Sequence, residues 1–192
     1  VVELRARFAG DPQLAIKATP GEGADVEMWL LGSSLFGAQL AAYLGIPYAF
    51  ASHFAPAQVD QALAAYRENF RPSEQLAKPH VMVAMTVITA DTDEEAQLLG
   101  SSYDRTFVDF RAGKPGKLKP PVAGYRDSLA PTDVRMLQHM RSVSAVGSKA
   151  TVRADIERFI DRTQADEIII GGSVFDQEAR CRSLFLTMEA LA

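Results

Sequence analysis

The segment Met28–Pro56, MWLLGSSLFGAQLAAYLGIPYAFASHFAP, contains the pattern that decides the fold. Two apolar runs flank an Ala- and Leu-rich stretch, and each run ends in small polar residues. The predicted order is strand (Met28–Leu31), polar tip (Gly32-Ser33-Ser34), helix (Leu35–Leu44), strand (Tyr48–Ala51) and polar tip (Ser52-His53-Phe54). This order is typical of a βαβ unit with two parallel strands. Both tips are therefore expected at the carboxyl edge of one sheet, where α/β proteins place their sites.

The composition indicates a globular protein without a basic face. The chain has 192 residues, of which 47% are hydrophobic, and a net charge of −4. Nucleic acids and anionic membranes attract basic surfaces, so neither is expected as a partner. No apolar run approaches the roughly 18 residues of a membrane-spanning helix, and no export signal is visible. The single cysteine, Cys181, excludes an internal disulfide and favours a cytoplasmic location. Val1 in place of a starting Met suggests processing, truncation or an upstream part.

The rest of the chain continues the alternation of strands and helices. Further strands are predicted at Leu14–Ala18, at Val81–Thr89 and at Ile168–Ile170, and Val143–Val146 is a brief apolar piece. Val1–Gly10 is interpreted as the last turns of a helix. Further helices are predicted at Val59–Phe70, from Asp91 to about Arg111, and at Thr132–Met140, Lys149–Arg162 and Phe175–Ala192. Gly113–Tyr125, rich in Pro, Gly and Lys, is long for a simple connection and is a candidate lid. No linker divides the chain, so residues 1–192 are expected to form one domain.

These repeated βα units define an α/β fold. Four strong strands, each followed by a helix, amount to half of an eight-fold (β/α)8 barrel. They would also fit an open, doubly wound sheet. Spacing alone leaves both arrangements open.

The first polar tip is a candidate anion site. Gly32-Ser33-Ser34 lies between a strand and a helix, where backbone N–H groups, serine hydroxyls and the helix dipole attract a phosphate. Gly37 keeps the first turn of the helix open. The alternative is simple capping of the helix by Ser33 or Ser34. The chain has no G-x-G-x-x-G, P-loop or G-x-S-x-G motif.

The second polar tip, Ser52-His53-Phe54, supplies an imidazole and an aromatic ring that could contact a planar ligand. A capping His in a loop is the alternative. The three His residues show no metal-ligand spacing, so no metal site is expected. Gly147-Ser148 could bind a second anion, but helix capping by Ser148 is favoured, and Gly171-Gly172 could mark a ligand or a tight turn. A full acid/base set is missing, which indicates that a cofactor would carry any difficult chemistry.

Three stretches resemble the bacterial-luciferase-like flavin monooxygenases. They are LLGSSLFGAQLAAYLGIPYAFASHFAP with the following YRENFRPS, the helix start at Ala90–Ala96, and VGSKATVRADIERFIDRTQADEIII. The resemblance covers nearly the whole chain. Members of this family are (β/α)8 barrels, and the chain resembles the second half, from about the fifth strand to the eighth.

The resemblance implies a flavin site and a reaction. It places the FMN phosphate at Ser33 and Ser34 with the Gly37 backbone nearby, and the isoalloxazine ring near Ser52 and His53, of which His53 is the catalytic candidate. Reduced FMN from a separate reductase would react with O2 and form a C4a-peroxyflavin, which would oxidise a small organic substrate. The resemblance further implies a homodimer of the full-length protein and a lid at Gly113–Tyr125. A deazaflavin-dependent oxidoreductase and a non-catalytic flavin-binding half barrel are the alternatives.

Overall fold

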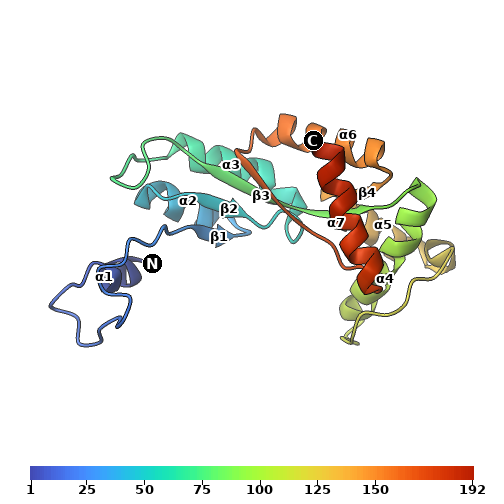
Figure 1. Ribbon diagram of the computed structural model, residues 1–192, viewed down its shortest axis with the longest axis horizontal. Coiled ribbons are helices and arrows are strands. Elements are labelled where there is room, and N and C mark those ends of the chain that lie inside the picture. The colour runs from blue at the N-terminus through green and yellow to red at the C-terminus, as the bar shows by residue number, and fades with distance from the viewer.

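A computed structural model describes residues 1–192, and its centre is a five-stranded parallel sheet (Figure 1). The strands are β1 (Leu30–Gly32), β2 (Tyr48–Phe50), β3 (Val81–Thr89), β4 (Ser144–Gly147) and β5 (Glu167–Gly171). The sheet runs β1-β2-β3-β4, and β5 also pairs with β3. Residues 82 and 83 pair with β2 and with β5, so these two strands flank β3 on opposite sides. β4 pairs with the carboxyl-terminal part of β3.

Seven α-helices connect and follow the strands. They are α1 (Val2–Phe8), α2 (Leu35–Leu44), α3 (Val59–Glu68), α4 (Asp93–Arg111), α5 (Pro131–Met140), α6 (Lys149–Thr163) and α7 (Gln177–Leu191). Short 3-10 turns occupy Pro56–Gln58, Tyr125–Ser128 and Arg141–Val143. None of the helices has the length and apolar character needed to cross a membrane.

Most predicted elements are confirmed, one predicted strand is wrong, and one strand was not predicted. The βαβ unit, the long strand β3 and the helices lie where the periodicity places them, within a few residues. Leu14–Ala18 forms no strand, because Leu14 closes a turn onto the Asp11 carbonyl and no neighbouring strand pairs with the segment. The brief apolar piece Val143–Val146 belongs to a true strand, β4, which was not predicted as a strand.

Helices α2, α3 and α6 cover one face of the sheet. Tyr48, Phe50, Val81 and Val83 point into the core on this face, together with small side chains of α2. The buried Tyr66 hydroxyl donates to the Ile46 carbonyl at 3.0 Å, which satisfies a polar group that burial would otherwise penalise. This layer is the main hydrophobic core.

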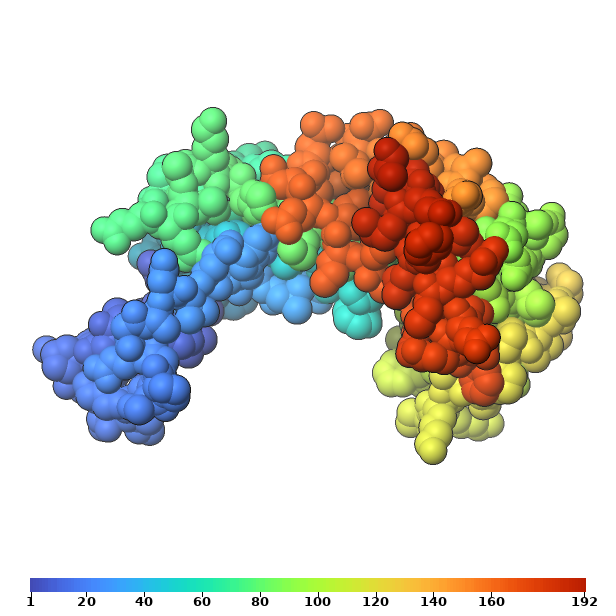
Figure 2. Space-filling view, in the orientation of Figure 1, coloured from blue at the N-terminus to red at the C-terminus, as the bar shows by residue number.

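The opposite face of the sheet is largely bare around β1 and β5. Leu31 is 70% exposed and Ile169 is 55% exposed, although each alternates with a core residue of its own strand. The carboxyl-terminal end of β3 is covered on this side, where Ile88 packs in a second cluster with Ala96 of α4 and Val146 of β4. Figure 2 shows the resulting arch, with the amino-terminal segment at one end, α4 and the following loop at the other, and a hollow between them.

Replacing either of two glycines of the βαβ unit with alanine is expected to change the stability of the protein, in opposite directions. Gly45 ends α2 at a φ of 63°, and an added Cβ would lie 2.4 Å from the Arg71 carbonyl oxygen. Gly37 lies in the first turn of α2, and its added Cβ would meet Leu30 at 3.4 Å, an ordinary contact. We expect Gly45→Ala to lower the free energy of unfolding by about 1–3 kcal/mol. Gly37→Ala should raise it by about 0.5 kcal/mol. Urea unfolding of both variants measures these changes. A Gly45→Ala protein as stable as the parent protein would contradict the prediction for Gly45.

Candidate functional site

The turn after β1 holds one free serine hydroxyl and one that caps a helix. Ser34 is the N-cap of α2, and its Oγ accepts a hydrogen bond from the Gly37 N–H at 3.4 Å. The Tyr48 hydroxyl donates to the Ser34 carbonyl at 3.1 Å and fixes the turn, while burial raises the pKa of Tyr48 to about 12. Ser33 is half-buried and forms no side-chain hydrogen bond within the chain. The capping alternative therefore holds for Ser34, and Ser33 remains available to a ligand.

The turn after β2 lies directly beside the turn after β1. The Ala51 N–H donates to the Gly32 carbonyl at 2.8 Å, one residue beyond the paired part of the strands. Ser52 is fully buried, and its Oγ donates to the Phe50 carbonyl and accepts from the Ala84 N–H, both at 3.2 Å. Its hydroxyl thus ties β2 to β3 and holds the backbone that leads into His53.

His53 projects from this turn with its imidazole half-buried. Its ring centroid lies 4.0 Å from that of Phe54, with the two planes tilted by 45°. Partial burial lowers the pKa of His53, because desolvation penalises the charged imidazolium. The side chain is therefore a neutral group at pH 7, able to donate and to accept hydrogen bonds.

Two pockets meet at His53, Phe54 and Tyr103. The smaller, of about 440 Å³, lies against β3 and the end of β5, between Ala84–Thr86 and Ile169–Ser173. The larger, of about 620 Å³, lies between the turn after β2, helices α4 and α5, and the loop after α4. Both volumes fall within the range of ligand sites. Tyr103 was not predicted as a site residue, because nothing in the α4 sequence distinguishes a pocket residue from a packed one.

The predicted glycine pair Gly171-Gly172, at the end of β5, lines the smaller pocket. A Cβ on Gly172 would lie 2.4 Å from the Val87 carbonyl oxygen. The close approach that requires glycine here is therefore to the backbone of β3. This supports the tight-turn alternative for Gly172 and leaves open space around Gly171, where no atom lies within 4 Å of an added Cβ.

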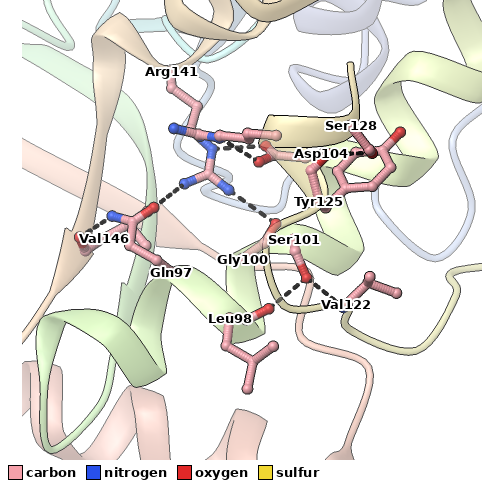
Figure 3. A network of polar contacts seen from close by, with 11 residues as sticks. Gln97, Leu98, Gly100, Ser101, Asp104, Val122, Tyr125, Ser128, Arg141 and Val146 are labelled. Atoms are coloured by element: carbon pink, nitrogen blue, oxygen red, sulfur yellow. Dashed lines mark hydrogen bonds and ion pairs between the residues drawn. The ribbon is translucent and has the colours of Figure 1, made fainter.

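A buried charge network holds the outer wall of the site (Figure 3). Asp104 of α4 is 1% exposed and accepts from Arg141 Nε at 2.8 Å and from Arg126 Nε at 2.9 Å. Arg141 also donates to the Gly100 carbonyl at 2.9 Å, and burial lowers its pKa although Asp104 opposes this. The network joins α4 to the chain segments on both sides of α5.

The predicted lid segment is attached to α4 along its second half. The Val122 N–H donates to Ser101 Oγ at 2.8 Å, and Arg105 donates to the Pro120 carbonyl at 2.6 Å (Figure 3 shows the former). The first half of the segment is less closely packed, since a Cβ added to Gly113 or Gly116 would meet open space. Pro115 and Gly116 line the larger pocket, and movement of this segment as a lid stays a prediction.

The predicted second anion site is filled by the chain itself. Asp93 accepts from the Ser148 N–H at 2.6 Å and from Thr151 Oγ1 at 3.1 Å, and these bonds lower its pKa. Ser148 is the N-cap residue of α6, as predicted, but its side chain makes no cap bond to the helix. No group of three or more His, Cys, Asp or Glu side chains is placed to hold a metal ion.

A parallel sheet with two ligand-sized pockets at its carboxyl edge defines an α/β protein with a strand-end site. Within this class, the luciferase-like monooxygenase family matches residues 1–166. The chain belongs to this family.

Relatives agree with this assignment. A luciferase-like monooxygenase of Escherichia coli (strain K12) is 44% identical over 190 residues, which are 98% of this chain and 57% of the relative. The uncharacterized protein YvbT of Bacillus subtilis (strain 168) is 44% identical over 183 residues, 94% of this chain and 54% of the relative. The chain therefore spans little more than half the length of these relatives.

Solved structures share the fold. The crystal structure of apo-MsnO8 superposes with a TM-score of 0.81 at 29% identity, over 99% of this chain and 58% of that one. The oxygenating constituent of 3,6-diketocamphane monooxygenase from Pseudomonas putida superposes with a TM-score of 0.55 at 20% identity, over 92% of this chain and 50% of that one. The second likeness shows the fold alone.

Removing the Asp104 carboxylate is expected to destabilise the outer wall. Asp104→Ala leaves the Arg141 guanidinium buried without its counter-charge, which should cost about 3 kcal/mol in the free energy of unfolding. Asp127→Asn, in the same segment as Arg126 but without an ion pair, is the control and should change little. Urea unfolding measures both, and equal stabilities of the two variants would rule out this role of Asp104.

The His53 imidazole is expected to titrate below pH 6.5. Because its folded pKa is lowered, His53 contributes its full stability above the unfolded value of 6.5, and the contribution is lost as pH falls through the folded pKa. An NMR titration of the imidazole signals, assigned with His53→Gln, should give a midpoint below 6.5. A midpoint at or above 6.5 would show that the ring is solvated.

Proposed function

We propose that this chain is the carboxyl-terminal half, strands five to eight, of a (β/α)8 barrel monooxygenase. In such a barrel, helices cover the outside of the strands, and the strands' inner face packs against the rest of the barrel. The bare sheet face around Leu31 and Ile169 supports this proposal, because a doubly wound sheet carries helices on both faces. The length of the relatives, nearly twice that of this chain, supports it too.

We propose that the enzyme uses reduced FMN and O2 to oxidise a small organic substrate. The observation that carries this proposal is the fit of the turn after β1 to a phosphate. Ser33 offers a hydroxyl without a partner beside the start of α2, where the first N–H groups of a helix have no partner within the helix. The 3,6-diketocamphane enzyme, which shares the fold, was solved in complex with FMN.

The remaining residues support a flavin ring beside His53. The smaller pocket extends from His53 along β3 to the glycines at the end of β5, and its lining is mostly apolar. When bound, reduced flavin supplies the electrons that activate O2. His53, neutral at pH 7, orients the ring by hydrogen bonding without adding charge, and Ser52 positions the backbone of that turn. The apolar walls exclude water from the reacting atoms.

The partners and location follow from the same proposal. A separate flavin reductase supplies the reduced FMN, the complete protein is a homodimer, and it works in the cytoplasm.

The phosphate assignment predicts a selective loss of FMN affinity. Ser33→Ala combined with Ser34→Ala removes two hydroxyls from the phosphate site, so the affinity for reduced FMN should fall at least about tenfold. Riboflavin, which lacks the phosphate, should bind the variant and the parent protein equally well. Anaerobic fluorescence titration measures both ligands in the longer protein and in this chain.

Two outcomes would contradict the assignment. Equal losses for FMN and riboflavin would show that the substitutions act through the cap of α2, which thermal unfolding of Ser34→Ala alone would reveal. Tighter binding of a deazaflavin cofactor than of FMN would contradict the assignment of FMN as the cofactor and would leave the proposed fold unaffected.

A further inference from the structure

The larger pocket has an unusually apolar and aromatic wall. Phe54, Phe107 and Phe110 line it, together with Met136 and Met140 of α5. Phe54 is 75% exposed and Phe110 is 62% exposed, so two large aromatic rings stand in solvent at this place. Exposed rings around a concave surface indicate that an apolar ligand covers them.

Arg111 is the only charged side chain that lines this pocket. The lining includes no Asp or Glu, although the chain as a whole carries a net charge of −4. Arg111 closes α4 where the loop begins, and Lys114 and Lys117 follow it in that loop. Arg111 therefore gives the pocket a positive charge within an acidic protein.

Arg111 is free to bind a ligand. Three other arginines of this region are committed to the structure, since Arg126 and Arg141 pair with Asp104, and Arg105 donates to the Pro120 carbonyl. Arg111 forms no ion pair and no side-chain hydrogen bond. The nearby Asp109 carboxylate is bonded to Lys119. A free guanidinium beside apolar walls recognises carboxylates and sulfonates through two parallel hydrogen bonds.

We propose that the larger pocket binds an apolar organic anion, with its hydrophobic body between the Phe54 and Phe107 rings and its carboxylate or sulfonate on Arg111. A cationic ligand would be attracted by the rings but repelled by Arg111, and a neutral one would leave the guanidinium without a partner. As the substrate site, this assignment rests on the proposed function. It fits because His53 lines both pockets, so the ligand body reaches the edge of the proposed flavin site.

A pair of fluorescent probes tests the charge preference in flavin-free protein. The anion 8-anilinonaphthalene-1-sulfonate should bind the parent chain, and Arg111→Gln should weaken it about tenfold. The neutral analogue N-phenyl-1-naphthylamine should bind both proteins within about twofold. Phe107→Ala should weaken both probes. Arg180→Gln, which removes a surface arginine of α7 outside the pocket, is the matched control and should leave both affinities unchanged.

The acid group is identified by competition. Displacement of the anionic probe by 2-naphthoate, by 2-naphthalenesulfonate or by both supports the site, and their relative affinities distinguish a carboxylate from a sulfonate ligand. Unchanged anion affinity in Arg111→Gln, or displacement by neither acid, would overturn it. Because these assays contain no flavin, they are independent of FMN binding. Anion binding without FMN binding would reject the proposed function and keep the anion site.

Discussion

The pairing of β3 with three other strands is the constraint on which the rest of the structure depends. β3 is nine residues long and almost wholly buried, so its peptide groups must find partners in neighbouring strands. It finds them in β2 and β5 on its two sides and in β4 near its end. All of these pairs are parallel, which forces the ends of β2 and β5 to the same edge. His53 and Gly171 therefore reach one pocket from segments more than a hundred residues apart in the sequence.

The second constraint is electrostatic and acts on the outer wall. Burying the Asp104 carboxylate would be costly without compensation, and two arginines provide it from segments on either side of α5. The geometry of the bonds orients α4 relative to those segments. Tyr103, the residue before Asp104 in the helix, lines both pockets. Asp104, Arg126 and Arg141 are outside the lining of the larger pocket, so they act on its shape through the placement of α4.

The sequence predicted those features that local patterns encode. The helix Leu35–Leu44 and the strand Val81–Thr89 follow from composition, periodicity and stop signals within the segment, and the structure has the same bounds. The tips Ser33 and His53 could be named because strand ends carry sites in parallel sheets. Strand β4 was missed as a strand because four residues show too little alternation to distinguish them from a loop. Leu14–Ala18 shows the opposite error, an apolar segment without a neighbouring strand to pair with.

Features that depend on distant residues could not be predicted in this way. The Asp93 carboxylate reaches the start of α6 from 55 positions away, and no local pattern distinguishes it from the acids that often begin a helix. The Asp104 network is equally hidden, since an Asp in a long amphipathic helix is usually solvated. Ser52 was expected to face a ligand, but its hydroxyl is used by the backbone of β2 and β3. Long-range hydrogen bonds decide which of the predicted polar groups remain free.

The two pockets differ in how much of their wall this chain supplies. The smaller one lies against the bare sheet face, with Ala84 and Ile169 in its lining, so its far side depends on whatever packs against that face. The larger one is enclosed by segments that follow strands β2 and β3, including α4 and α5, which are all present. Under the two proposals, this chain alone supplies the wall that selects the apolar anion, whereas the proposed flavin site depends on what packs against the bare sheet face.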